Sequence, residues 1–203
     1  MNLFLASASP RRRELLSQAG FTFQVHPAHI PEDPLPNEDP IAYVVRLARQ
    51  KAETVFAEIT RAGASDKRAS APPQVVGADT TVTIDNQILG KPEDPADAAR
   101  MLRLLSGRTH RVITGVALVT ETHTEVAAEV TGVRFLTLSD EEITDYVATG
   151  EPMDKAGAYA IQGRAARWIP RITGDYFNVV GLPLALVTTM LEAIASNPNP
   201  LSS

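Results

Sequence analysis

The first twenty residues contain a strand, a short turn and a helix, and this order limits the fold that the chain can adopt. Residues 3–7 (LFLAS) are a short apolar run of the kind found in buried strands. Ser9 and Pro10 suit the N-cap and first position of a helix, and Gly20 suits the position just after its end. Because strands and helices continue to alternate, we expect an α/β protein with a mixed β-sheet and flanking helices.

Periodicity and capping residues place further elements along the chain. Residues 40–63 carry apolar positions along one side of a long helix. Residues 74–92 have the pattern of two strands, with Asp85 and Asn86 at the turn between them. We also expect a strand over residues 21–28, a proline-rich loop over 27–40, an exposed loop over 64–73, a helix from Asp94 to Gly107, two or three strands over 111–138, a helix capped by Ser139 and Glu142, a strand over 166–174 and a last helix over 183–196.

Composition excludes several classes of protein. The chain has 203 residues, of which 44% are hydrophobic and 21% charged, and no internal repeat is visible, so we expect one domain over residues 1–203. A net charge of −5 argues against a nucleic acid polymer as partner. Without cysteine the chain has no disulfide, thiolate metal site or cysteine nucleophile. No run approaches the roughly 18 apolar residues of a membrane span, and the start does not resemble a secretory signal, so we expect a cytoplasmic protein without membrane contact.

Three consecutive arginines, Arg11 to Arg13, stand where cations are electrostatically unfavourable. The amino end of a helix carries partial positive charge and attracts anions rather than cations. The hydroxyls of Ser7 and Ser9 and the backbone N–H groups of the turn lie beside these arginines. Together they could bind a polyphosphate, which would cancel the repulsion. The alternative is an ordinary solvated helix surface.

Asp79 follows an apolar pair and precedes an alternating strand pattern in GADTTV. If the hairpin closes at Asp85 and Asn86, Lys91 lies roughly across from Asp79 on the neighbouring strand. A carboxylate beside a lysine stays ionised, and it can bind Mg²⁺ or orient a water molecule. The alternative is an aspartate that caps a turn.

Residues 149–163 (TGEPMDKAGAYAIQG) combine three glycines with charged residues and Gln162. This composition is typical of backbone fitted closely around a ligand, although a plain loop is the alternative. The amide of Gln162 can donate and accept, as the carbonyl and imide N–H of a pyrimidine require. His110 is expected to be structural, and the spacing of His26 and His29 does not indicate a metal site.

Several motifs in this order resemble the Maf family of nucleoside triphosphate pyrophosphatases. They are LASASPRRRELL, VVRLARQKA, GADTTV, LGKPEDPADAARMLRLLSGRTHRVITGV, TGEPMDKAGAYAIQG and GDYFNVVGLPL, and they cover residues 5–184. The resemblance implies hydrolysis of a nucleoside triphosphate to the monophosphate and pyrophosphate with a divalent metal, usually Mg²⁺, with Mn²⁺ as the other candidate. It also implies two α/β lobes around one deep cleft, as in inosine triphosphate pyrophosphatases, and a homodimer.

The same resemblance assigns roles to individual residues. Asp79 matches the family's proton acceptor, and Arg11, Thr80 and Gln162 match positions associated with substrate choice. Their identities are similar to the branch that takes dTTP and UTP. The remaining expected residues line the cleft: Ser7, Arg12, Lys51, Lys91 and Lys155 for phosphate binding, and Glu32 together with Asp79 for the metal.

Three alternatives to this function stay open at this stage. They are a Maf enzyme that prefers 7-methyl-GTP, a non-catalytic nucleotide-binding regulator of septum formation, and a structural interaction protein. The sequence also leaves open whether Asp79 is the base or mainly a metal ligand, and whether the physiological nucleotide is canonical or modified.

Overall fold

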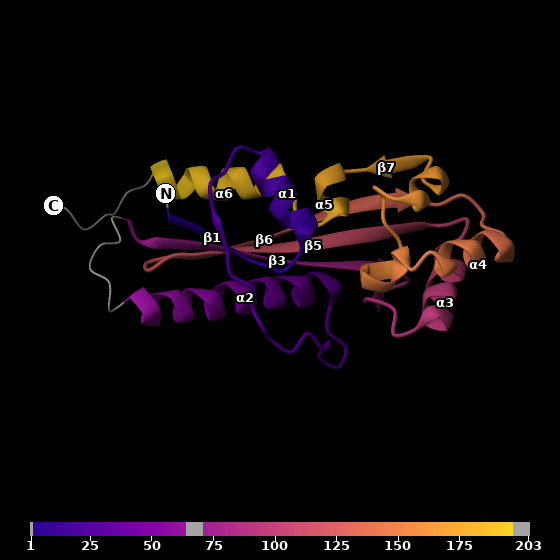
Figure 1. The fold of residues 1–203 in the computed structure, drawn as a ribbon, viewed down its shortest axis with the longest axis horizontal. Coiled ribbons are helices and arrows are strands. Elements are labelled where there is room, and N and C mark those ends of the chain that lie inside the picture. Colours follow the sequence, from indigo (N-terminus) through magenta and orange to yellow (C-terminus); the bar gives the residue numbers. More distant parts are fainter. Residues whose placement is uncertain (1, 64–70, 197–203) are drawn as a thin grey trace.

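The computed structural model describes residues 2–63 and 71–196, which form an elongated mixed β-sheet with helices on both faces (Figure 1). The strands of the sheet lie in the order β2-β1-β3-β5-β6-β7, and β4 pairs with β3. This architecture confirms the expected fold class. The strands are β1 (Asn2–Ala6), β2 (Gln24–Val25), β3 (Pro73–Ile84), β4 (Gln87–Leu89), β5 (Thr109–Val119), β6 (Thr124–Arg134) and β7 (Arg171–Thr173).

Helices cover the two faces of the sheet in different ways. The long helix α2 lies along one face, whereas α1, α5 and α6 lie on the other, and α3 and α4 stand at the far end of the sheet (Figure 1). Their bounds are α1 (Pro10–Gln18), α2 (Pro40–Gly63), α3 (Pro95–Leu105), α4 (Asp140–Ala148), α5 (Tyr176–Val180) and α6 (Leu184–Ser196), with 3₁₀ turns η1 (Glu151–Asp154), η2 (Ala156–Ala158) and η3 (Arg164–Trp168). None of the described helices is long and apolar enough to cross a membrane.

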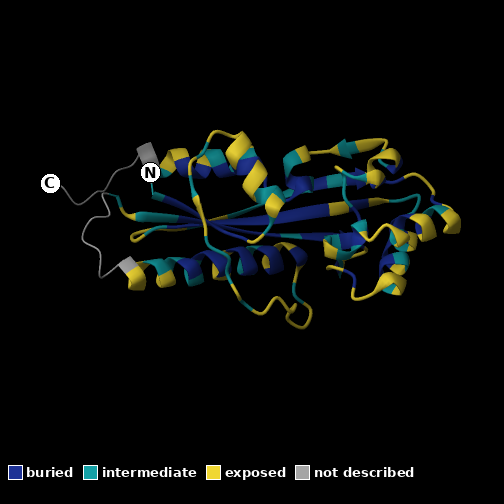
Figure 2. Ribbon diagram, in the orientation of Figure 1, coloured by how far each residue is buried: buried dark blue, intermediate teal, exposed yellow. Residues whose placement is uncertain are grey.

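The apolar side chains form separate cores at the two ends of the sheet. Dark, buried residues follow the central strands and the helix faces that touch them (Figure 2). At the end that contains β1, residues such as Leu5, Leu16 and Val76 pack on one face, and Phe4, Val55 and Val75 pack on the other. At the far end, Val82, Leu102, Val133, Tyr146 and Trp168 belong to one cluster.

Strand β3 runs from one core to the other and is left with a gap beside it. Along one side, β5 pairs with β3 from Val75 to Thr83. Along the other side, β1 pairs with β3 only as far as Gly77, and β4 pairs with it only from Val82 onward. In the part of the chain that the structure describes, residues 78–81 therefore have a strand neighbour on one side alone, and we call this gap the notch.

Two glycines allow α2 to lie unusually close to the sheet. A Cβ added to Gly77 would stand 2.2 Å from the carbonyl oxygen of Ala48, and one added to Gly115 would stand 2.4 Å from that of Val44. Both distances are too short for any side chain. The close approach places Lys51 of α2 against the strands that border the notch.

Local signals in the sequence predicted most element ends. Ser9 and Asp94 accept hydrogen bonds from backbone N–H groups of the first turns of α1 and α3, as expected for N-caps. The capping box formed by Ser139 and Glu142 is present at α4. The turn at Asp85 and Asn86 is confirmed as well.

Three expectations differ from the structure. The strand expected over residues 21–28 is reduced to β2, since Phe21 and Phe23 pack into the core instead of extending the sheet. The strand expected over 166–174 is wrong in its first half, where η3 buries Trp168 and its indole N–H donates to Glu142. Helix α5 was not expected. Most of the loop expected over 64–73 lies outside the described residues.

His110 is a structural residue, as the sequence indicated. Its Nε2 lies 2.8 Å from the hydroxyl of Tyr159, and both rings pack on Phe135. Burial lowers the pKa of His110 to about 3, so the ring is neutral at pH 7.

The fit between α2 and the sheet predicts the effect of one added methyl group. Gly115→Ala should lower the free energy of unfolding by at least about 1–3 kcal/mol, because the new Cβ overlaps the backbone of α2. Chemical denaturation measures this change. Gly90→Ala is the control, since no atom lies within 4 Å of its added Cβ. Equal stability of the two variants would contradict the close packing.

Candidate active site

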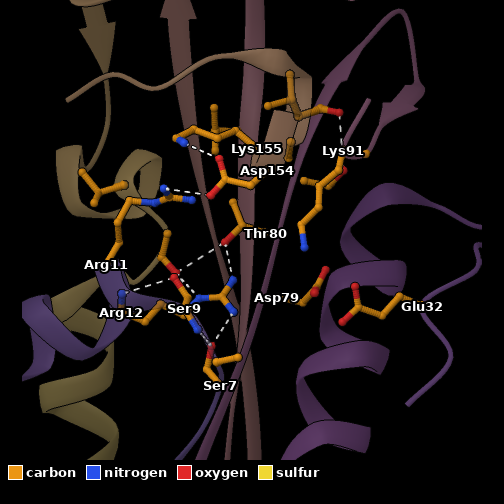
Figure 3. A pocket seen from close by; sticks show the side chains of 18 of the residues that line it. Ser7, Ser9, Arg11, Arg12, Glu32, Asp79, Thr80, Lys91, Asp154 and Lys155 are labelled. Carbon is orange, nitrogen blue, oxygen red and sulfur yellow. Dashed lines mark hydrogen bonds and ion pairs between the residues drawn. The ribbon is translucent and has the colours of Figure 1, made fainter. Parts of the chain in front are cut away.

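A cavity of about 720 Å³ opens at the notch (Figure 3). The turn after β1 and the start of α1 border it on one side, and the loop after β4 borders it on another. Such a volume is typical of small-molecule sites. All site residues predicted from the sequence line this cavity: Ser7, Arg11, Arg12, Glu32, Lys51, Asp79, Thr80, Lys91, Lys155 and Gln162.

Asp79 forms a buried ion pair with Lys51. The Lys51 Nζ lies 2.6 Å from Oδ1 of Asp79 and also 2.6 Å from Oε1 of Glu32. The side chains of Lys51 and Asp79 are only 9% and 10% exposed, whereas that of Glu32 is 50% exposed. One ammonium group therefore joins a buried carboxylate to a carboxylate that faces solvent.

The two carboxylates differ in acidity. Burial raises the pKa of Asp79, and the charges of Lys51 and Arg12 offset this only in part. Burial also acts to raise the pKa of Glu32, but the hydrogen bond and charge of Lys51, with further help from Lys91, outweigh it and lower the pKa. Asp79 is therefore the more basic carboxylate of the pair.

Arg12 is held almost entirely by protein groups. Its Nε donates to the carbonyl of Gly181 at 2.8 Å, and its Nη1 donates to the carbonyl of Ala78 at 2.8 Å and to the hydroxyl of Ser7 at 3.2 Å. Its Nη2 donates to Thr80 at 2.9 Å. Four of the five guanidinium N–H bonds thus have protein acceptors, which leaves one for a ligand. Arg12 therefore lies at the notch, where its guanidinium group donates to the carbonyl of Ala78.

Arg11 and Lys155 come from different parts of the chain and lie on the same side of the cavity. Asp154 lies between them, 3.7 Å from Nη1 of Arg11 and in direct contact with Nζ of Lys155 (Figure 3). The Lys155 ammonium also donates to the carbonyl of Glu151 at 3.1 Å. An anionic ligand could therefore contact both Arg11 and Lys155, which share the carboxylate of Asp154 in this structure.

Lys91 points into the cavity toward Asp79 and Glu32 (Figure 3). Strand β4 ends at Leu89, so Lys91 lies in the loop beyond the strand and not opposite Asp79 in the ladder, as the sequence had suggested. The expected proximity is nevertheless present. No ion pair involves its ammonium group within the described residues.

The donor set suits a hard divalent cation. Oxygen atoms of Asp79 and Glu32 contact the same ammonium group, so both carboxylates can reach one point in the cavity. Mg²⁺ is commonly bound through one or two carboxylates, with water and substrate phosphate completing the shell. Within residues 2–63 and 71–196, no group of three or more acidic, histidine or cysteine side chains forms a fuller metal site.

Sequence reasoning missed residues that support the site from behind. Thr114 and Asn178 are fully buried and connect α5 to the strands below Thr80. Tyr43 of α2 donates a hydrogen bond to the backbone carbonyl of Glu32 at 2.9 Å. Thr114 and Asn178 each lie inside one of the family motifs, and this was the only signal in the sequence that could have pointed to them. It did not indicate what they do.

The chain matches the family model described as Maf-like protein over residues 2–194. It is 53% identical to a protein of Koribacter versatilis, over 95% of this chain and 94% of the relative. A protein of Geobacter metallireducens is 51% identical over 96% of both chains, and one of Bacillus pumilus is 46% identical over 97% of this chain and 98% of the relative. All three relatives are named dTTP/UTP pyrophosphatase.

Removing the charge of Lys51 should change the pKa of Asp79. Lys51→Met removes the nearest cation but keeps a long side chain, so the pKa of Asp79 should rise further above its ordinary value. Carbon-13 NMR of labelled aspartate carboxyl groups follows this titration. Arg49→Met, at an exposed position of the same helix, should leave it unchanged. A pKa of Asp79 that stays the same or falls in Lys51→Met would refute the pairing.

Proposed function

This chain belongs to the Maf family, and we propose that it hydrolyses dTTP and UTP to the nucleoside monophosphate and pyrophosphate. One observation supports the proposal above others. In a protein of net charge −5, one cavity is lined by Arg11, Lys91 and Lys155 and also by Asp79, a carboxylate whose pKa is raised. A homodimer belongs to the proposal too, on the strength of the family resemblance, and so does the cytoplasmic location that the sequence led us to expect.

The cations of the cavity would bind the triphosphate. Lys91 points into the cavity, and Arg11 and Lys155 can exchange Asp154 for phosphate oxygens. Arg12 has one N–H left for a ligand, so it would attract the triphosphate mainly by its positive charge and not by several hydrogen bonds. Its other N–H groups connect Gly181, Ala78 and Thr80 in the wall of the cavity. Hydrolysis of a phosphoanhydride depends mainly on such positioning and charge neutralisation.

Asp79 is suited to accept the proton of the attacking water. As the water oxygen bonds to the α-phosphorus, the proton passes to Asp79 and the bond between that phosphorus and the α–β bridging oxygen breaks. Pyrophosphate leaves with the electron pair of that bond. The raised pKa of Asp79 makes it a stronger base than an ordinary aspartate, and kcat/KM should fall as pH decreases through this pKa.

Glu32 and Asp79 would hold the divalent cation, Mg²⁺ or Mn²⁺. When bound, the cation would neutralise charge on the phosphate oxygens. The lowered pKa of Glu32 keeps that carboxylate ionised and available as a ligand. Lys51 bridges both carboxylates and would hold them in place, with one N–H free for phosphate.

Gln162 and Thr80 are the proposed contacts for the pyrimidine base or the sugar next to it. Both line the cavity, and neither carries a charge that would favour phosphate. An amide can donate to a carbonyl of uracil or thymine, and a hydroxyl can accept from the imide N–H.

Replacement of Asp79 tests the proposed chemistry. Asp79→Asn should lower release of pyrophosphate from UTP at least about 10²–10⁴-fold, because the amide does not accept the proton. Separate assays of pyrophosphate and phosphate measure this loss, and circular dichroism checks the fold. Asp85→Asn, on an exposed turn with an ion pair to Arg108, is the matched control and should retain full activity. Substantial turnover by Asp79→Asn would remove Asp79 from the central role.

A panel of triphosphates tests the proposed substrates. With Mg²⁺ present, dTTP and UTP should be hydrolysed faster than CTP, GTP and 7-methyl-GTP. Gln162→Leu should lower kcat/KM for UTP by an amount equivalent to roughly 1–3 kcal/mol, because a carbonyl of the base loses its hydrogen-bond donor. Faster turnover of 7-methyl-GTP than of UTP would overturn the substrate assignment, and binding without any turnover would favour a regulator.

A further inference from the structure

The hydroxyl of Thr80 lies within reach of three hydrogen-bonding groups of the protein. Its Oγ1 accepts from Nη2 of Arg12 at 2.9 Å and lies 2.9 Å from Oγ1 of Thr114 (Figure 3 shows the contact with Arg12). The carbonyl of Gly181 is a third neighbour, at 3.4 Å. Thr80 and Thr114 are directly opposed on β3 and β5, where cross-strand side chains meet.

The single proton of this hydroxyl can be placed from its neighbours. Arg12 can only donate, so Thr80 must accept from it. Thr114 donates to the backbone carbonyl of Asn178 at 3.2 Å, and it is then an acceptor for the proton of Thr80. If Thr114 instead donates to Thr80, the proton of Thr80 goes to the carbonyl of Gly181. In both arrangements a protein group binds the proton of Thr80, and the first arrangement also leaves one lone pair of the Thr80 oxygen for a ligand.

The support behind Thr80 is rigid. Thr114 and Asn178 are fully buried, and the Asn178 side-chain amide donates to the carbonyl of Val112 at 3.0 Å and to the hydroxyl of Thr131 at 2.9 Å. The backbone carbonyl of Asn178 also accepts from the N–H of Gly181 at 3.0 Å. Helix α5 is therefore fixed to β5 and β6 directly behind the cavity wall.

We propose that Thr114 is a positioning residue for substrate choice: it takes up the hydroxyl proton of Thr80, so that Thr80 meets the nucleotide only as a hydrogen-bond acceptor. An acceptor at this point selects a base with an N–H group there. Uracil and thymine carry such a group at N3, whereas cytosine has an unprotonated nitrogen. This inference rests on the proposed function, because it assigns that N–H of the dTTP or UTP base to Thr80.

Thr114→Val tests the inference with almost no change in volume. Without the Thr114 hydroxyl, the remaining inward acceptor is the carbonyl of Gly181 at 3.4 Å, near the limit of a hydrogen bond. Thr80 can then turn its proton toward the cavity and donate to N3 of cytosine. The preference for UTP over CTP in kcat/KM should fall roughly tenfold, as expected for one hydrogen bond. Thr114→Ser restores the hydroxyl and should restore the preference.

Thr131→Val is the matched control. Thr131 is also buried, also binds Asn178, and donates to the carbonyl of Asp175 at 2.9 Å, but it does not touch Thr80. This variant loosens α5 in a similar way and should keep the UTP-to-CTP ratio. An equal loss of preference in Thr131→Val, or an unchanged ratio in folded Thr114→Val, would overturn the inference.

A double-mutant cycle and a binding measurement complete the test. Thr80→Val should lower the preference by itself, and Thr114→Val should add nothing to it, since Thr114 acts through Thr80. Additive effects would refute the inference. Calorimetric affinities for UMP and CMP measure the same preference without turnover. If the wild-type protein hydrolysed no triphosphate, the proposed function would be refuted, but the binding preference could still be tested. If Thr114→Val does not fold, Thr114→Ala replaces it.

Discussion

The site depends on one missing neighbour in the sheet. Within the described residues, β3 pairs over 78–81 with β5 on one side and with no strand on the other, because β1 stops at Ala6 and β4 ends opposite Val82. Side chains from both faces of β3 reach the same space at such a gap. Asp79 reaches it from the face covered by α2, and Thr80 reaches it from the face covered by α1 and α5. The start of α1 places Arg11 and Arg12 at the cavity, and the loop after β4 places Lys91 there.

A second constraint is the cost of burying a carboxylate. Asp79 is tolerated because Lys51 pairs with it, and Lys51 reaches it because Gly77 and Gly115 let α2 lie against the sheet. Removal of Lys51 would leave the buried carboxylate of Asp79 without its nearest cation, which is unfavourable. The raised pKa of Asp79 and the lowered pKa of Glu32 follow from this arrangement. Packing at two glycines therefore sets the chemistry of the proposed base.

The sequence was informative where local rules act and silent where distant segments meet. The caps at Ser9, Asp94 and Ser139 depend on neighbouring residues and were predicted correctly. The family resemblance named the proposed site residues, and all of them line the cavity. The notch could not be foreseen, because strand register is decided by contacts far apart in the chain. For the same reason, the binding of Lys51 between two carboxylates, the almost complete use of Arg12 by the protein, and the contact of Thr114 with Thr80 emerged only in three dimensions.

The central claim is that the notch directs water to the α-phosphorus of a bound pyrimidine triphosphate. Hydrolysis of UTP in ¹⁸O-labelled water, followed by mass spectrometry of the products, tests it most directly. The account predicts one labelled oxygen in UMP and none in pyrophosphate. Label in pyrophosphate, or release of labelled inorganic phosphate, would place the attack at another phosphorus and contradict the account.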